Sequence, residues 1–278
     1  MKPKKPSALK YKIAMIGRGA VAFEVLTYAL NDARFDVALV LQPGRPAPTE
    51  FALNQAKVLF GLEELLAWKP DLVIEAAGKV ALQTYVAPCL AAGVSVIAAS
   101  VGALADEALY KTLHQATITG RSQLILPSGA IGALDYLSAT RFAAPSAEAP
   151  TEIIYESRKP PSAWRDVLAE RGLPLTPDAP ITLFEGSARE AAKLFPQNLN
   201  VAATIALAGV GMDNTRVRVV VDPAATGNMH TITATGSFGS LSTQIINRPS
   251  PTNPKTSWVV GLSIIAALDR YVAPIVVG

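Results

Sequence analysis

The stretch "KIAMIGRGAVAFEVLTYAL", residues 12–30, predicts a strand, a glycine turn and a helix in succession. Its apolar start is typical of a buried strand that ends at Gly17, and a helical pattern begins at residue 20. Gly17, Gly19 and Ala22 have the G-x-G-x-x-G/A spacing of dinucleotide-binding turns. Gly17 allows the tight turn, Gly19 lets the backbone approach a pyrophosphate, and Ala22 permits close helix–strand packing.

The position of this turn favours a dinucleotide site; a turn that serves packing alone is the alternative. The N-terminus of a helix offers unpaired N–H groups and a partial positive charge, and both stabilise a bound pyrophosphate. We therefore predict that NAD or NADP binds here. The expected contacts in this turn are Gly17, Arg18, Gly19, Ala20 and Val21.

Strand and helix patterns continue to alternate as far as residue 129. Further strands are expected at 35–41, 71–78, 95–104 and 122–129, and further helices at 61–70, 80–93 and 106–120. Strict alternation implies right-handed crossovers and a parallel sheet covered by helices on both faces. The predicted fold class is α/β, with a Rossmann-type doubly wound domain over residues 1–127.

The end of the second strand bears on the choice of cofactor. Sites specific for NAD usually carry an acidic residue there, which binds the ribose hydroxyls. This chain has Leu41 and Gln42 at that point, and Arg45 follows in "VLQPGR". No carboxylate repels a 2′-phosphate, and Arg45 or Arg18 could neutralise one. We therefore expect NADP to be accepted alongside NAD.

Two further segments lie at the carboxyl ends of predicted strands, where ligands bind in open parallel sheets. They are "EAAG" (75–78) and "ASVGAL" (99–104), and their small residues would let the backbone close over the nicotinamide half. Packing of strands against helices is the alternative reason for small residues here. The expected contacts are Ala76, Ala77, Gly78, Ser100, Val101 and Gly102.

The pattern changes in the second half of the chain, which predicts an α+β domain over 128–250 and a C-terminal helix within 251–278 that packs back on the core. Helices are expected near 130–142 and at 186–195 and 198–208, and strands at 151–158, 215–222, 229–236 and 241–247, with a Pro-rich loop after the first of these strands. Ser187 and Glu190 have the spacing of a capping box. The short connections between the last three strands favour antiparallel pairing in a mixed or antiparallel sheet.

Composition excludes several classes of protein. Half of the residues are hydrophobic and 17% are charged, which excludes a disordered or fibrous chain. The basic start "MKPKKPSALKYK" has too little charge and aromatic support for a nucleic-acid arm, and no signal-type core or membrane-length apolar run follows. The single cysteine, Cys89, excludes an internal disulfide and a Cys-rich metal site. We expect a cytoplasmic protein that binds neither nucleic acid nor membranes.

The chain has two histidines, His114 and His230. His114 lies late in a predicted helix and is interpreted as a partly exposed residue near the C-terminal dipole. His230 shares a strand face with Ile232 and Ala234, and this alternation alone favours a core histidine. However, His230 opens its strand directly after a Gly-Asn turn, a place where site residues are common. No second histidine or cysteine lies at ligand spacing, so no metal site is predicted.

Several long phrases resemble the L-aspartate dehydrogenase family. They are "SVGAL", "LPSGAIGALD" (126–135), "SRKPP" (157–161), "FEGSAREAAKLFPQNLNVAA" (184–203), "DPAATGNMHTITATG" (222–236) and "PSPTNPKTS" (249–257). The resemblance implies oxidative deamination of L-aspartate with NAD or NADP, through iminoaspartate to oxaloacetate and ammonia, which in some organisms supplies NAD synthesis. It also implies a homodimer of two-domain subunits.

The resemblance assigns roles to individual residues. Ala130 and Asn200 match cofactor-binding positions of the family, and His230 matches its catalytic histidine. The chemistry agrees, because the amine must be neutral before hydride leaves and the imine must then be attacked by water. Histidine has an unperturbed pKa suited to that proton transfer. The chain departs from the family at Gly227, where relatives often have arginine.

A dicarboxylate substrate needs cations in its site. Arg158 and Lys159 in "SRKPP" follow a predicted strand, and a solvated charge pair is the alternative interpretation. Asn228 lies two residues before His230 and could orient substrate or water. We expect these three residues to contact the substrate. The competing functions are a Rossmann oxidoreductase of the homoserine dehydrogenase or dihydrodipicolinate reductase type, and a non-catalytic NAD(P) sensor.

Overall fold

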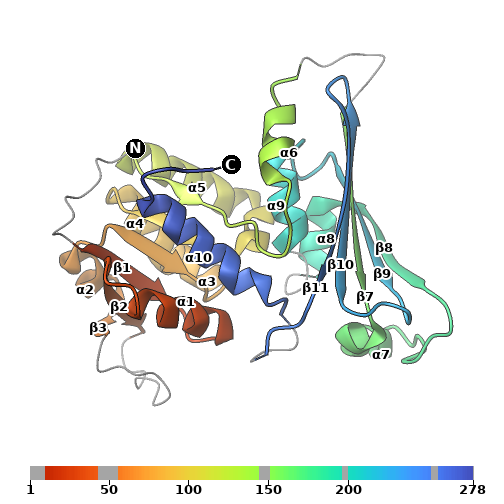
Figure 1. The fold of residues 1–278 in the computed structure, drawn as a ribbon, viewed down its shortest axis with the longest axis horizontal. Coiled ribbons are helices and arrows are strands. Elements are labelled where there is room, and N and C mark those ends of the chain that lie inside the picture. The colour runs from red at the N-terminus through yellow and green to blue at the C-terminus, as the bar shows by residue number, and fades with distance from the viewer. Residues whose placement is uncertain (1–9, 43–55, 144–150, 196–199, 252–255, 278) are drawn as a thin grey trace. The chain divides into compact units, whose positions relative to one another are not determined.

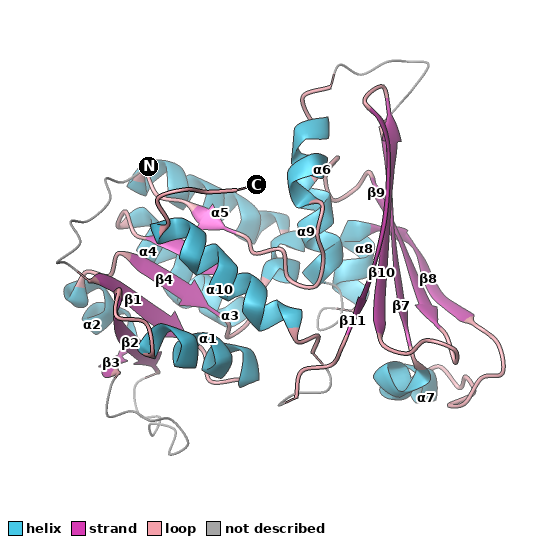
Figure 2. Ribbon diagram, viewed as in Figure 1, coloured by secondary structure: helices cyan, strands magenta, loops and turns pink. Residues whose placement is uncertain are grey.

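The computed structural model describes residues 10–42, 56–143, 151–195, 200–251 and 256–277. The chain divides into two units (Figures 1 and 2). The first unit comprises Met1–Pro127 and Gly261–Gly278, and the second comprises Ser128–Val260. Each unit has its own sheet. Among the described residues, no helix combines the length and apolarity needed to cross a membrane.

The first unit contains a six-stranded parallel sheet, which confirms the predicted Rossmann-type fold. Its strands are β1 (Tyr11–Ile16), β2 (Phe35–Leu41), β3 (Lys57–Phe60), β4 (Leu72–Glu75), β5 (Ser95–Ala98) and β6 (Leu124–Ile125), in the order β3-β2-β1-β4-β5-β6. The strand order therefore reverses between β1 and β4. The short strand β3 was not expected, because its four residues run directly into the next helix.

The α-helices of the first unit follow the predicted positions, but a 3₁₀ turn occupies residues 101–105, where the end of a strand was expected. The helical segments of this unit are α1 (Ala20–Leu30), α2 (Gly61–Trp68), α3 (Lys79–Ala81), the π turn η2 (Leu82–Val86), α4 (Ala87–Ala91), the 3₁₀ turn η3 (Val101–Ala105), α5 (Glu107–Gly120) and, from its third residue on, α10 (Val259–Val272). The helix expected at 80–93 contains the π turn because Pro88 has no N–H and its ring crowds the preceding turn. It ends before Gly93, whose φ is +84°.

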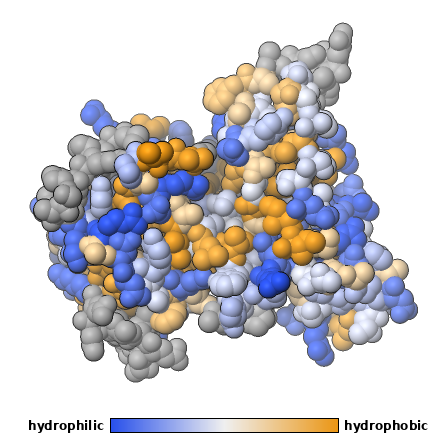
Figure 3. All heavy atoms as spheres, in the orientation of Figure 1, coloured by the Kyte–Doolittle hydropathy of each residue, from blue (hydrophilic) through white to orange (hydrophobic). Residues whose placement is uncertain are grey.

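Helix α10 packs against the core of the first unit. Ile264, Ala267, Leu268 and Val272 join the apolar residues of β1, β2 and α1 in one buried cluster. Leu262, on the outer side of the helix, stays exposed. Figure 3 shows hydrophobic and hydrophilic residues side by side on this face of the molecule. Burial of four apolar side chains fixes the helix to this unit through the hydrophobic effect.

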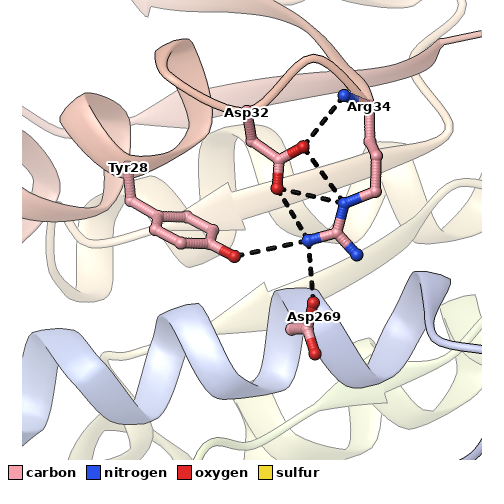
Figure 4. A network of polar contacts seen from close by, with 4 residues as sticks. All are labelled: Tyr28, Asp32, Arg34 and Asp269. Carbon is pink, nitrogen blue, oxygen red and sulfur yellow. Dashed lines mark hydrogen bonds and ion pairs between the residues drawn. The ribbon is translucent and has the colours of Figure 1, made fainter.

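A polar network also ties α10 to the start of β2 (Figure 4). The Arg34 guanidinium donates to Asp269 at 2.8 Å and to Asp32 at 2.7 Å, and it also contacts the Tyr28 hydroxyl at 3.3 Å. Hydrogen bonds from Arg34 lower the pKa of Asp32. These groups are partly exposed, so the network orients the helix more than it stabilises the fold.

The second unit contains a five-stranded mixed sheet. Its strands are β7 (Glu152–Lys159), β8 (Ile181–Ser187), β9 (Thr215–Val221), β10 (Asn228–Gly236) and β11 (Gly239–Asn247), in the order β11-β10-β7-β9-β8. Its helical segments are α6 (Leu134–Thr140), η4 (Pro161–Trp164), α7 (Arg165–Glu170), α8 (Ala188–Leu194) and α9 (Asn200–Ala208). The capping box of Ser187 and Glu190 is confirmed at the start of α8.

Two expectations for this sheet were wrong. The strands β10 and β11 are antiparallel as predicted, but β9 pairs with β7 and β8 and not with β10. The connection 222–227 is long enough to pass the end of one intervening strand, so short length did not force neighbours to pair. The segment expected to be a Pro-rich loop also contains α7 and leads into β8.

Candidate functional site

The glycine turn has the geometry that a dinucleotide requires. Gly17 has a φ of +146°, and a Cβ built there would lie 2.6 Å from the Ala76 carbonyl oxygen and 3.0 Å from the Ala22 Cβ. Gly19 is the N-cap of α1 and has no side chain to cap it, and a Cβ built there would meet nothing within 4 Å. The first N–H groups of α1 are therefore available to an anion, and the backbone can approach it closely.

The other residues expected around the cofactor fall in different places. Arg18 is exposed beside the turn, Ala20 and Val21 form the first turn of α1, and Gln42 is exposed directly after β2. Arg45 lies outside the described residues. The glycine turn thus follows the carboxyl end of β1, and Gln42 follows that of the neighbouring strand β2. The strand order reverses on the other side of β1, between β1 and β4, which is where ligands bind in open parallel sheets.

The loops after β4 and β5 are joined by a side chain that the sequence analysis missed. Glu75 is fully buried, and its Oε1 accepts hydrogen bonds from the N–H groups of Ala77 (2.6 Å) and Gly78 (2.8 Å). Oε1 also accepts from the Ser100 hydroxyl at 2.8 Å, and Oε2 accepts from the Ser100 N–H at 3.3 Å. The N–H groups of Ala77, Gly78 and Ser100 are therefore directed at Glu75.

The neighbouring residues complete this edge of the sheet. Ala76 donates its N–H to the Ile16 carbonyl at 2.8 Å, which places it beside the glycine turn. Val101 and Gly102 open the turn η3, where Val101 is buried and Gly102 is partly exposed. The two segments expected at the nicotinamide half therefore lie together at one edge of the first unit.

In the second unit, His230 lies in a buried and polar environment. Its side chain is 3% exposed, and Nδ1 is 2.7 Å from the Tyr155 hydroxyl, with the two rings stacked at an interplanar angle of 13°. Nε2 is buried and has no hydrogen-bond partner among the described residues. Burial, with a smaller contribution from the Lys159 charge, lowers the pKa of His230 to about 3. The ring is therefore neutral at neutral pH, and the hydrogen-bonding capacity of its Nε2 is unused among the described residues.

Lys159 shares this environment. Every second residue of β7 is buried, namely Ile153, Tyr155, Ser157 and Lys159. Ser157 pairs directly with His230 of the neighbouring strand β10. The Lys159 ammonium lies 5.4 Å from the centre of the Trp164 ring, which is a cation–π distance. Burial lowers the pKa of Lys159 to about 8. One sheet face thus holds a neutral imidazole and a desolvated amine.

Arg158 and Asn228 differ from Lys159 in their placement. Arg158 is adjacent to Lys159 in a strand and therefore points to the opposite face. It donates to Glu156 at 2.9 Å and to Asp222 at 2.8 Å, so carboxylates of this unit already pair it. Asn228 is partly buried and donates to the Ser257 hydroxyl at 3.0 Å. The geometry favours Lys159 over Arg158 as the cation beside His230.

The positions assigned through the family resemblance are also in the second unit. Ala130 is 5% exposed, and its carbonyl oxygen accepts a hydrogen bond from Asn247 at 2.8 Å. Asn200 is exposed at the first residue of α9. At Gly227 a Cβ would lie 2.7 Å from the Asn247 carbonyl oxygen, so any larger residue at this position would require a shifted backbone.

The second histidine belongs to the first unit. His114 is exposed on α5 and stacks on Tyr110 at 6.1 Å between ring centres, as expected for a surface residue. Within the described ranges, no three His, Cys, Asp or Glu side chains are grouped so that they could hold a metal ion. Tyr155 was missed by the sequence analysis, although a buried tyrosine in a strand needs a partner for its hydroxyl.

Comparison with known proteins gives consistent similarities. A family described as "Aspartate dehydrogenase, C-terminal" matches residues 141–271, and one described as "Homoserine dehydrogenase, NAD binding domain" matches residues 17–127. L-aspartate dehydrogenase 2 of Bordetella pertussis is 46% identical over 97% of this chain and 100% of its own length. L-aspartate dehydrogenase of Ruegeria pomeroyi is 40% identical over 97% of this chain and 96% of its own.

Solved structures show the same similarity. The crystal structure of aspartate dehydrogenase from Thermotoga maritima superposes with a TM-score of 0.74 at 26% identity, covering 97% of this chain and all of the other. An archaeal homoserine dehydrogenase with NADPH reaches a TM-score of 0.56 at 10% identity, over 94% of this chain and 97% of its own. The second likeness concerns the fold alone.

Proposed function

The chain belongs to the L-aspartate dehydrogenase family, and we propose that it catalyses the NAD(P)-dependent oxidative deamination of L-aspartate to oxaloacetate and ammonia through iminoaspartate. The observation that carries the proposal is the buried face of β7 and β10. There the Nε2 of His230, which has no hydrogen-bond partner among the described residues, lies close enough to Lys159 for the lysine charge to act on the ring. A substrate with an amine and two carboxylates needs one group that moves protons and one that carries positive charge.

The first unit supplies the cofactor site in this proposal. The open space at Gly19 and the uncapped start of α1 suit a pyrophosphate, and the crowded space behind Gly17 sets the turn. We assign the remaining cofactor contacts to the loops after β4 and β5, and to Ala130 and Asn200 by family position. When bound, NAD or NADP accepts the hydride from the α-carbon of aspartate.

His230 is the proposed proton carrier. Its Nε2 takes the proton from the substrate ammonium, which frees the nitrogen lone pair, and releases this proton to solvent. Nε2 then takes a proton from the water that attacks the imine carbon, and returns it to the substrate nitrogen as ammonia leaves. The Tyr155 hydroxyl can donate to Nδ1 or accept from it, so the ring can present either a lone pair or a proton at Nε2. A dianionic substrate beside the ring raises its pKa from the low value that burial imposes.

Lys159 is the proposed partner of a substrate carboxylate, with Asn228 a polar contact nearby. Arg158 stays a weaker proposal because its guanidinium already binds two carboxylates on the other face. An ammonium desolvated by burial gains more from an incoming anion than an exposed one does. Lys159 thereby favours dicarboxylates over uncharged substrates.

The charge of Lys159 predicts how substrate binding depends on pH. With a pKa of about 8, the side chain is cationic below that pH and neutral above it. The inhibition constant of succinate, a dicarboxylate without an amine, should therefore rise by up to about tenfold per pH unit above 8. In Lys159→Arg the side chain stays cationic above pH 8, so the inhibition constant of succinate should no longer rise there. A flat profile in the natural protein, or the same break in the arginine variant, would contradict this role.

The loop after β2 predicts cofactor preference. Arg45→Ala should raise the Michaelis constant for NADP relative to that for NAD, because a 2′-phosphate loses a charge-assisted partner. Initial rates with both cofactors measure this ratio, and Arg18→Ala is the matched variant on the glycine turn. An unchanged ratio in Arg45→Ala would show that Arg45 does not contact the phosphate.

The reaction itself is tested by following reduced cofactor while L-aspartate, homoserine or no substrate is supplied. The proposal expects reduction with aspartate only. Reduction with homoserine would favour the related dehydrogenase activity, a candidate that the match of residues 17–127 supports. Cofactor binding without turnover of any substrate would favour a sensor.

We further propose a cytoplasmic homodimer that supplies iminoaspartate for NAD synthesis. Family membership supports this assignment, and exposed apolar side chains near the start of α10, Trp258, Val259 and Leu262, are available for a subunit contact. Light scattering of the purified protein tests the dimer, and a monomeric mass at working concentration would overturn it.

A further inference from the structure

Glu75 is a buried acid whose partners are all hydrogen-bond donors of two loops. It ends β4 and is fully buried, and burial raises the pKa of its carboxyl against the opposing effect of four hydrogen bonds. Those bonds come from the N–H groups of Ala77, Gly78 and Ser100 and from the Ser100 hydroxyl. An apolar side chain in its place would leave these donors without their partner, which costs free energy. Glu75 therefore helps to hold the two loops that it binds.

The bonded groups form one closed arrangement. Gly78 donates its N–H both to Glu75 at 2.8 Å and to the Ser100 hydroxyl at 3.0 Å. The Ser100 hydroxyl in turn donates to Glu75. The loop after β4 and the loop after β5 are thus held to each other through a single carboxylate. Gly78 has a φ of +99°, a conformation that few other residues adopt. The hydrogen bonds to Glu75 and Ser100 hold the loop in this conformation.

The place of these two loops in the sheet indicates which end of the cofactor they face. In a sheet of order β3-β2-β1-β4-β5-β6, each half binds one mononucleotide, and the first βα turn binds the pyrophosphate between them. The half with β2 carries the adenosine, as the role of the second strand requires. The loops after β4 and β5 therefore belong to the nicotinamide half.

We propose that Glu75 is a positioning residue that fixes the loops after β4 and β5 in the shape that receives the nicotinamide end of NAD(P). This inference rests on the proposed cofactor function and deepens it. Glu75 acts through Gly78 and Ser100 and does not touch the cofactor. Because the N–H groups of Gly78 and Ser100 donate to Glu75, they are already paired when the cofactor binds.

The test compares two ligands that share every group except the nicotinamide riboside end. Glu75→Gln keeps the size of the side chain and can keep the three bonds at Oε1, but its NH₂ group then faces the Ser100 N–H. We expect the dissociation constant of NADH, measured by protein fluorescence, to rise by about tenfold. The dissociation constant of ADP-ribose, measured by calorimetry, should change by less than about twofold, because the glycine turn is untouched.

Two further variants separate positioning from stability. Ser100→Ala removes the hydroxyl that accepts from Gly78 and donates to Glu75. It should also weaken the binding of NADH more than the binding of ADP-ribose. Val96→Ala, in the buried middle of β5, lowers the melting temperature by creating a cavity and should leave the ratio of the two constants unchanged.

The outcomes distinguish the two proposals. If the natural protein binds neither ligand, the proposed cofactor function fails. If the natural protein binds both and Glu75→Gln retains the natural ratio, or if Val96→Ala shifts the ratio equally, the positioning role is wrong while the cofactor function stands.

Discussion

Replacing His230 with alanine is expected to lower kcat for L-aspartate by on the order of 10²–10⁴-fold, while the dissociation constant of NADH stays within about twofold. The reason is that Nε2 of His230 is the proposed proton acceptor, buried and without a hydrogen-bond partner among the described residues, on the face that carries Lys159. Steady-state rates with aspartate and fluorescence titration with NADH measure the two quantities on the same preparation.

Tyr155→Phe is the matched control for His230. It removes only the hydroxyl that holds Nδ1 at 2.7 Å, so the ring keeps its stacking partner and loses its orienting bond. We expect a smaller fall in kcat than in His230→Ala. Near-natural turnover in His230→Ala, with NADH still bound, would rule out the acid–base role.

The second large effect is expected from two substitutions in the glycine turn, Gly17→Ala and Gly19→Ala, which act for different physical reasons. Gly17→Ala places a methyl group 2.6 Å from the Ala76 carbonyl oxygen in a backbone with φ +146°, and should cost about 1–3 kcal/mol of unfolding free energy. Gly19→Ala adds the same methyl group in open space, at the N-cap of α1, and should cost below about 1 kcal/mol.

Both variants should weaken NADH binding by about tenfold or more, since one distorts the turn and the other occupies the path of the pyrophosphate. Chemical denaturation measures the stability and fluorescence titration measures the binding. Unchanged NADH affinity in a stably folded Gly19→Ala protein would show that the pyrophosphate does not approach this residue.

The sequence predicted the first unit well because its signals are local. The apolar strands and amphipathic helices that follow Gly17 alternate, and parallel pairing follows from that alternation. The second unit was less predictable, because the order of its strands depends on the path of the six-residue connection between β9 and β10. That connection passes the end of β7, so β7 lies between the two strands. Residues 57–60 and 181–187 were missed since a four-residue strand and a strand after a Pro-rich segment carry little periodicity.

For the candidate site, the sequence indicated the residue types but not their contacts. His230 and Lys159 share a face because β7 and β10 are neighbours, which no local pattern shows. Arg158 and Lys159 looked equivalent as a pair, and strand alternation placed them on opposite faces. The low pKa of His230 and the bracing role of Glu75 both follow from burial, which depends on the folded chain as a whole.

The proposed activity is tested most directly by measuring the products of a single reaction with L-aspartate and NAD or NADP. Reduced cofactor is followed by absorbance, and ammonia and oxaloacetate are determined in the same sample. Equal amounts of all three products are expected. Absence of reduced cofactor, or reduced cofactor formed without ammonia, would contradict the proposed activity.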